Sequence, residues 1–201
     1  MRALMLSGTL LTGTVAMLLV GLAGPAFADV LAGTGSLSQL HHNISLFNSQ
    51  SSSGHVQFVA GKFSLGQAFR ITSIDGLMYP PDGKLKVKLY GDAAGLPGGQ
   101  LFSEDFTTAR SQTANWPAFG PLLNWTRPAG TYWVAFEPYD GVDFGAMPGI
   151  VQNPLTSYAV WHKFSGGWTT DTGTPIDVGF RINGNLVPEP GALVLLMTAA
   201  G

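Results

Sequence analysis

The residues from Lys84 to Tyr90 alternate between lysine and an apolar side chain. Leucine, valine and leucine stand at positions 85, 87 and 89, so an extended segment would have one apolar face and one lysine face. A period of two residues fits a β-strand, whose successive side chains point to opposite faces, and does not fit a helix. We expect a strand with one buried face and one soluble outer face. A binding surface for acidic polysaccharide is the alternative interpretation of the lysine face.

Similar short patterns follow one another along most of the chain. The sequence has 27 glycines and 13 prolines but only 11% charged residues, a composition that breaks helices and favours short strands joined by turns. We therefore predict an all-β fold, an antiparallel β-sandwich with jelly-roll-like connections. A long glycine-rich turn is expected at 91–99 and a two-residue hairpin turn within 165–168. The expected strands are 55–59, 62–69, 71–79, 84–90, 100–107, 116–125, 131–137, 157–164 and 176–182.

The first 28 residues have the parts of a secretory signal peptide. A positive charge at Arg2 precedes an apolar stretch at 10–24, and Ala26 and Ala28 form the small-x-small pattern that signal peptidase accepts. We expect a signal helix that is cleaved after Ala28, so that the mature chain begins at Asp29. An uncleaved membrane anchor is the alternative.

The last fifteen residues combine a stiff tripeptide with an apolar tail. Two prolines flank Glu189 and keep the chain extended there, and no charged residue follows Pro190. This segment resembles the PEP-CTERM sorting signal of exopolysaccharide-producing Gram-negative bacteria. The residues that match its first part are Val187, Pro188, Glu189 and Pro190.

In that family the motif precedes a membrane-spanning helix and an arginine-rich end. The resemblance implies recognition by exosortase, a membrane transpeptidase-like enzyme, and release or transfer at the cell exterior. Here the apolar run is about half of the ~20 residues that a spanning helix needs, and no arginines follow. We expect a truncated or degenerate signal that gives transient membrane association. The expected location is the cell surface or extracellular matrix of a Gram-negative bacterium, with signal peptidase, an exosortase-type enzyme and extracellular polysaccharide as partners.

The middle of the chain is similar to the β-sandwich modules called choice-of-anchor domains. The shared features are a Tyr-x-Asp turn at 90–92, a Gly-x-Pro-Gly loop at 95–98 and the segment Gly130-Thr131-Tyr132-Trp133. The resemblance implies the fold and transfers no catalytic residue. We expect a signal peptide at 1–28, an irregular leader with at most one edge strand at 29–54, a β-sandwich domain at 55–184 and the sorting signal at 185–201.

Candidate catalytic and metal-binding residues form no complete set. Glu104 and Asp105 would face opposite sides of a strand. Glu137 could face Glu104 at the separation of about 5–10 Å that glycosidases need, although no spacing brings them together. His41 and the histidine after it, His42, lack a third metal ligand at a suitable spacing. The chain has no cysteine, and its net charge of −2 offers no basic field for nucleic acid.

We therefore predict a protein that is not an enzyme, has no metal centre and needs no cofactor. Aspartates at 140–143 and 171–174 could hold a structural calcium ion, but stabilisation of turns by aspartate is the favoured interpretation. Trp133 and Trp161 are expected in the core, whereas Trp116 and Trp168 are the candidates for stacking on sugar rings.

Three functions remain open at this point. The favoured one is an exported structural or adhesive protein associated with exopolysaccharide. A carbohydrate-binding module that uses Trp116 or Trp168 is the second, and a polysaccharide-active enzyme that uses Glu137 is the third.

Overall fold

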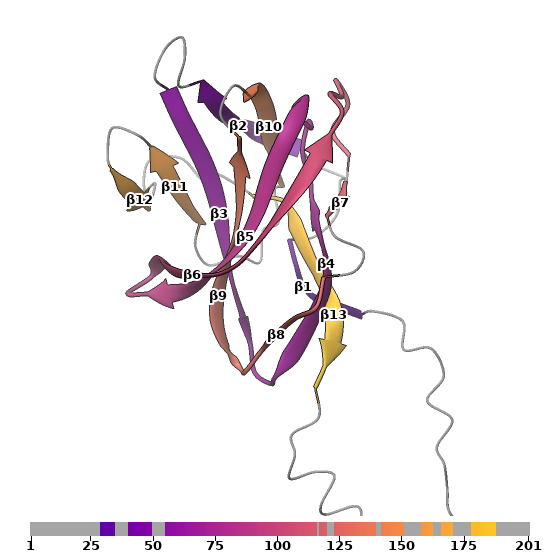
Figure 1. The fold of residues 1–201 in the computed structure, drawn as a ribbon, viewed down its shortest axis with the longest axis vertical. Helices are drawn as coiled ribbons and strands as arrows, with labels where there is room; N and C mark the ends of the chain where they lie inside the picture. Colours follow the sequence, from indigo (N-terminus) through magenta and orange to yellow (C-terminus); the bar gives the residue numbers. More distant parts are fainter. Residues whose placement is uncertain are drawn as a thin grey trace, which may run out of the picture.

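The computed structural model describes residues 29–34, 40–49, 55–115, 117–119, 123–139, 142–150, 158–162, 166–170 and 178–187. All regular elements in these ranges are strands, and all strand pairings between them are antiparallel. The predicted all-β class is confirmed. The strands form two sheets (Figure 1).

The smaller sheet has the order β1-β13-β4-β7, and β8 also pairs with β4. β1 is therefore at the edge of this sheet and β13 lies beside it. The strands are β1 (Asp29–Gly33), β4 (Phe69–Gly76), β7 (Ala118–Phe119), β8 (Trp125–Arg127) and β13 (Phe180–Leu186).

The larger sheet has the order β10-β2-β3-β9-β5-β6. The hairpin β11–β12 joins it through β3, which also pairs with β2. The strands are β2 (Leu40–Ser49), β3 (His55–Leu65), β5 (Gly83–Ala93), β6 (Leu96–Thr108), β9 (Gly130–Pro138), β10 (Val142–Ile150), β11 (Tyr158–His162) and β12 (Gly167–Thr169).

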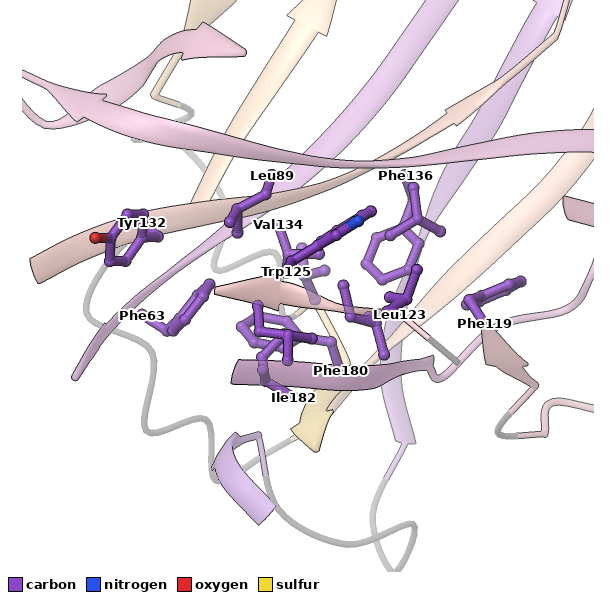
Figure 2. Packing of buried hydrophobic residues seen from close by; sticks show 14 of the residues in the cluster. Phe63, Leu89, Phe119, Leu123, Trp125, Tyr132, Val134, Phe136, Phe180 and Ile182 are labelled. Carbon is purple, nitrogen blue, oxygen red and sulfur yellow. The ribbon is translucent and has the colours of Figure 1, made fainter. Parts of the chain in front are cut away.

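One hydrophobic core joins the two sheets into a sandwich-like body (Figure 2). Leu89 and Phe136 enter it from the larger sheet, and Phe180 and Ile182 enter it from β13. The predicted alternation is confirmed, since Leu85 and its apolar neighbours at 87 and 89 are fully buried. Each such side chain contributes about 1.5–3 kcal/mol by leaving water. Burial of these apolar faces therefore holds the two layers together.

The segment 29–54, predicted as an irregular leader with at most one edge strand, contains two strands. β1 pairs with β13 in the smaller sheet, and β2 pairs with β3 and β10 in the larger sheet. The strand propensity of a residue mainly reflects how its side chain packs on a sheet. A segment rich in Ser, Gly and Asn therefore has low strand propensity, even where its backbone pairs with neighbouring strands. Residues 29–33 and 40–49 thus belong to the two sheets, and β13 continues the paired strands to Leu186.

The glycine-rich segment 91–99 is not the long turn that we predicted. β5 and β6 continue into it and are joined by the two residues Ala94 and Gly95, with φ angles of 53° and 87°. Positive φ at both central residues is the signature of the type I′ turn that matches the twist of a hairpin. Gly98 lets the strands approach, because a Cβ there would lie 2.7 Å from the Ala93 Cβ. The glycines here allow a two-residue turn and close strand pairing instead of a loose loop.

Other strand predictions were partly wrong. β10 and β12 were not expected, because their short or glycine- and proline-containing sequences lack clean alternation. The β11–β12 connection spans residues 163–166 rather than two residues, although Gly166 has the expected positive φ of 66°. The strand predicted at 176–182 begins at Phe180 and runs to Leu186. The signal helix and the apolar tail lie outside the described residues.

Candidate functional site

The face of the larger sheet that looks away from the main core carries a second buried cluster. It contains Ala60, Tyr90, Trp133, Ala135 and Ala159, with Leu96 and Trp168 packed against it. Three strands separate β12 from β5 in the sheet order, yet the ring of Trp168 lies 5.8 Å from that of Tyr90, edge to face. The β11–β12 hairpin is therefore folded back over this outer face.

An alanine row makes room for the rings of this cluster. Ala135 pairs with Ala60, which pairs in turn with Ala159. Small side chains in one row across three strands leave space above the sheet that larger neighbours fill. Tyr90 pairs with Trp133 in the next row.

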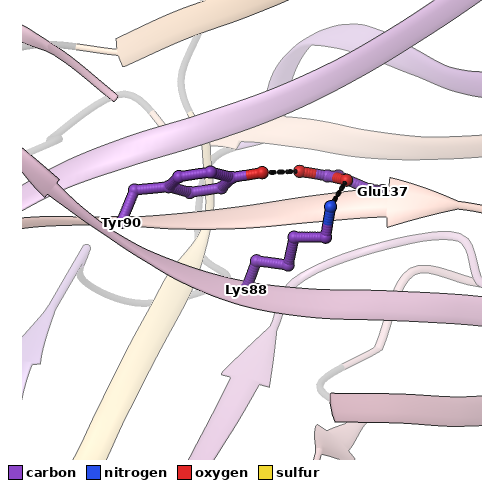
Figure 3. A network of polar contacts seen from close by, with 3 residues as sticks. All are labelled: Lys88, Tyr90 and Glu137. Atoms are coloured by element: carbon purple, nitrogen blue, oxygen red, sulfur yellow. Dashed lines mark hydrogen bonds and ion pairs between the residues drawn. The ribbon is translucent and has the colours of Figure 1, made fainter. Parts of the chain in front are cut away.

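A three-residue polar network lies on the same face (Figure 3). The Tyr90 hydroxyl donates a hydrogen bond of 2.6 Å to Glu137 Oε1, and Lys88 Nζ lies 2.6 Å from Oε2. The exposed fraction of the side chain is 7% for Glu137 and 17% for Lys88. A buried carboxylate is tolerated when it is paired and hydrogen-bonded, and both oxygens of Glu137 are engaged.

Tyr90 is held in its protonated form. Burial is the largest cause that raises the pKa of its phenol well above the usual range, and the charge of Glu137 and the hydrogen bond to it raise this pKa further. A phenolate beside a carboxylate in a dry site would be doubly unfavourable. Tyr90 is thus a hydrogen-bond donor at neutral pH and not a base.

Trp133 anchors the other side of the cluster. Its side chain is fully buried, as predicted, but in the outer cluster rather than between the sheets. The indole Nε1 donates a 2.8 Å hydrogen bond to Asp92 Oδ1, and Lys62 Nζ lies 5.5 Å from the ring centroid. Asp92 also accepts a hydrogen bond from the backbone N–H of Gly95, so Trp133 is tied to the β5–β6 turn.

The register rules out the Glu104–Glu137 carboxylate pair of the hydrolase alternative. Glu104 pairs with Val87, whose side chain points into the core, so Glu104 and Glu137 lie on opposite faces. Asp105 and Glu137 both pair with Lys86, on opposite sides of β5. Because two strand spacings separate their backbones, they lie about 10 Å apart. Asp105 accepts a hydrogen bond from Tyr139.

The lysine face of β5 is not the continuous soluble surface that we expected. Lys84 is exposed, whereas Lys86 and Lys88 are half-buried. Lys86 Nζ lies 4.2 Å from the ring centroid of Tyr139, and Lys88 neutralises Glu137. The prediction failed because it could not include the aromatic and acidic side chains that neighbouring strands bring to this face.

A groove of about 610 Å³ lies where β1 begins and β13 ends. Asp29 pairs with Gly184, and the Val187 N–H donates a 2.8 Å hydrogen bond to the Ala68 carbonyl. The first residue after the predicted signal cleavage and the first residue of the predicted sorting motif thus lie at one end of the molecule. The groove is lined by Asp29, Val30, Leu31, Leu65, Gly66, Gln67, Asn185 and Leu186.

A second pocket of about 300 Å³ lies beside β6 and β7. Phe106 and Phe119 give it an aromatic wall, and Thr107 and Asn115 add polar groups. Asn115 and Pro117, both lining residues, flank Trp116, which is itself outside the described residues.

The structure brings only some of the predicted site residues together. Trp168, a candidate for stacking on sugar rings, is half-buried against Tyr90. His41 and His42 fall on β2, without a described side chain. Predicted site residues outside the described ranges are Ala26, Ala28, Pro188, Glu189, Pro190 and the calcium candidates at 171–174, and the aspartate side chains at 140–143 are outside them too.

The described ranges lack two other kinds of feature. Within them, no group of three or more His, Cys, Asp or Glu side chains is arranged to hold a metal ion. The same ranges contain no helix long and apolar enough to cross a membrane. Comparisons with family models, curated proteins and solved structures found no match to this chain.

Proposed function

We propose that this chain is an exported, non-enzymatic protein that is sorted through a PEP-CTERM-type signal. The observation that carries the proposal is the pair of sequence patterns at the two ends, a signal-peptide pattern that ends at Ala28 and a motif at 187–190 followed by an apolar tail. The structure supports it by placing the first residue after the predicted cleavage and the first residue of the motif at one end of the body, since Asp29 pairs with Gly184 and Val187 donates a backbone hydrogen bond to Ala68.

The body between these points suits a structural or adhesive role. We take it to be a β-sandwich with jelly-roll-like connections, associated with exopolysaccharide at the cell surface or in the extracellular matrix of a Gram-negative bacterium. Lys88 and Tyr90 occupy both oxygens of Glu137, the acid of the enzyme alternative. This supports a structural carboxylate over a general acid that must face substrate.

Intact-mass spectrometry of the protein in its exporting host tests the proposal. We expect an N-terminus at Asp29 and loss of the segment beyond the sorting motif. A variant with Pro188→Ala and Glu189→Ala should keep its C-terminal segment, while Glu104→Ala, an exposed change on β6, should mature normally. Protein that stays in the cytoplasm, or exported protein that still ends at Gly201, would refute the proposal.

A carbohydrate-binding module is the second candidate, and the pocket beside β6 and β7 favours it. Aromatic rings next to hydroxyl and amide groups match the two kinds of contact that a sugar ring offers. Glycan-array binding that is lost in Asn115→Ala and Trp116→Ala but kept in Trp168→Ala would place the ligand in this pocket. Loss only in Trp168→Ala would point to the hairpin instead, and absence of binding to any glycan would discard the candidate.

A further inference from the structure

The predicted sorting motif leaves the fold without a linker. Leu186 pairs with Phe69, and the next residue, Val187, is hydrogen-bonded to Ala68. An extended chain advances at most about 3.6 Å per residue, so Glu189 lies within about 7 Å of Val187. An enzyme that grips residues 187–190 must therefore approach the surface of the domain itself.

The surface next to this exit is the groove between β1, β13 and the β3–β4 connection. Val30 and Leu186 line it and are 60% and 52% exposed; they are the large hydrophobic side chains that the described residues leave exposed. Leu31 and Leu65 add apolar surface between them, while Gln67 adds a polar group. Single exposed apolar residues are ordinary, but two that face one groove beside a processing motif form a small apolar centre, as in protein–protein interfaces.

The N-terminal processing point lies at the same groove. Asp29 pairs with Gly184, two residues before the end of β13, and it is also a lining residue. The sheet register therefore places both predicted processing points, Asp29 and Val187, at one end of the body. A membrane-bound enzyme that faces one of them also faces the groove.

We propose that this groove is the docking surface through which the membrane-bound processing enzyme engages the domain while it recognises residues 187–190. The proposal rests on the proposed sorting function and adds a second contact to it. The enzyme would cover Val30 and Leu186 and thereby hold the motif in place.

Pulse–chase measurement of C-terminal processing in the exporting host tests this docking surface. The double variant Val30→Thr, Leu186→Thr places a β-branched side chain, which suits a strand, at both positions but removes apolar area. We expect its processing rate to fall at least about fivefold, since covering two half-exposed apolar side chains is worth more than 1 kcal/mol. The control is Lys84→Ala on β5, an exposed change at a residue that does not line the groove, and it should be processed at the wild-type rate.

A linker variant separates docking from folding effects. Eight Gly and Ser residues between Leu186 and Val187 leave both the groove and the motif intact but uncouple them. We expect slower processing of this variant, and no further slowing when the two threonine changes are added. Unfolding curves of the purified mature variants should match that of wild type; a loss of stability in the threonine variant alone leaves the linker variant as the deciding measurement.

The outcomes distinguish this inference from the sorting function. If the wild-type chain is never processed, the sorting function itself fails. If wild type is processed and both the threonine and the linker variants match its rate, only the docking surface fails. Groove-dependent binding of the mature protein to phospholipid vesicles without enzyme would assign the groove to a lipid surface and overturn the proposal. Protection of Val30 amide exchange that disappears on deleting residues 191–201 would assign it to the chain's own tail, with the same consequence.

Discussion

The inner and outer faces of the larger sheet are built by the same strands, β5 and β9, but are stabilised in different ways. Toward the core, Leu89 and Phe136 pack against apolar side chains of the opposite sheet. On the outer face, Tyr90 donates a directional hydrogen bond to Glu137, and Trp168 of the folded-back hairpin packs against the Tyr90 ring. Apolar packing is non-directional and tolerates small adjustments, whereas a buried ion pair depends on all of its partners. The inner face should therefore dominate stability, and the outer face should determine how stability responds to pH and charge.

The largest effect is expected from truncation on the inner face. Phe136 is fully buried, and its ring lies 6.0 Å from that of Phe119 on the smaller sheet, so it bridges the two layers. Phe136→Ala should lower the free energy of unfolding by about 3–5 kcal/mol through lost burial and the cavity left behind. Urea unfolding followed by tryptophan fluorescence measures the change. Lys84→Ala, an exposed change, serves as the control, and a loss below about 1 kcal/mol for Phe136→Ala would contradict the assigned core.

Removing the buried charge should have the next largest effect. Glu137→Gln keeps the shape but leaves Lys88 without its partner, and we expect a loss of about 2–4 kcal/mol, because Lys88 retains a little access to water. Adding Lys88→Met should recover part of that loss. The double-mutant cycle, measured by urea unfolding, should give a coupling of about 1–3 kcal/mol. Additive losses would mean that the outer face does not depend on the ion pair.

Tyr90→Phe should reveal the pH response of the outer face. The variant loses a hydrogen bond to a charged group, so about 1–2 kcal/mol of stability should disappear at pH 7. The folded-state pKa of Tyr90 is raised, so the unfolded chain loses this proton first as pH rises. The stabilisation that Tyr90 contributes to the wild-type protein should thus be fully present below about pH 10 and should decline above it. Urea unfolding at pH 8 and 10.5 should give a difference between wild type and variant that shrinks at the higher pH; an unchanged difference would exclude this linkage.

The smallest effect is expected where the hairpin covers the outer face. Trp168→Ala removes the edge-to-face contact with the Tyr90 ring, which is worth about 0.5–1.5 kcal/mol beyond area burial. Amide exchange should accelerate in β11 and β12 while the exchange of β4 stays unchanged. Equal acceleration in both sheets would show that the hairpin is part of the main cooperative unit rather than a cover.

The inner face could be predicted from the sequence because its signal is local. Alternation at 84–90 alone identifies the strand and its buried side, and the structure confirms both. The glycines at 91–99 were also a correct signal of special backbone geometry, but not of its extent. Whether they form a loose loop or a two-residue turn depends on how far the β5–β6 ladder continues.

The outer-face network was missed, although one signal was present. In β9 the residues from Tyr132 to Phe136 are apolar without interruption, which is typical of a strand buried on both faces. That pattern requires something to cover Trp133 and Ala135 and places Glu137 at the end of the covered stretch. It does not identify the cover, because the hairpin that provides it lies about 30 residues further along the chain.

The sequence by itself determined that segments with clean alternation, such as 84–90, are strands, which of their faces is apolar, and where glycines allow positive φ, since these properties depend on neighbours one or two residues away. Tertiary structure decided that β1 and β2 join the two sheets, that Lys86 and Lys88 become half-buried, and that Asp29 and Val187 lie at one end of the molecule. Each of these depends on strand register between distant segments. The backbone hydrogen bonds that join such segments are available to every residue except proline as a donor, so side-chain composition does not reveal which segments pair.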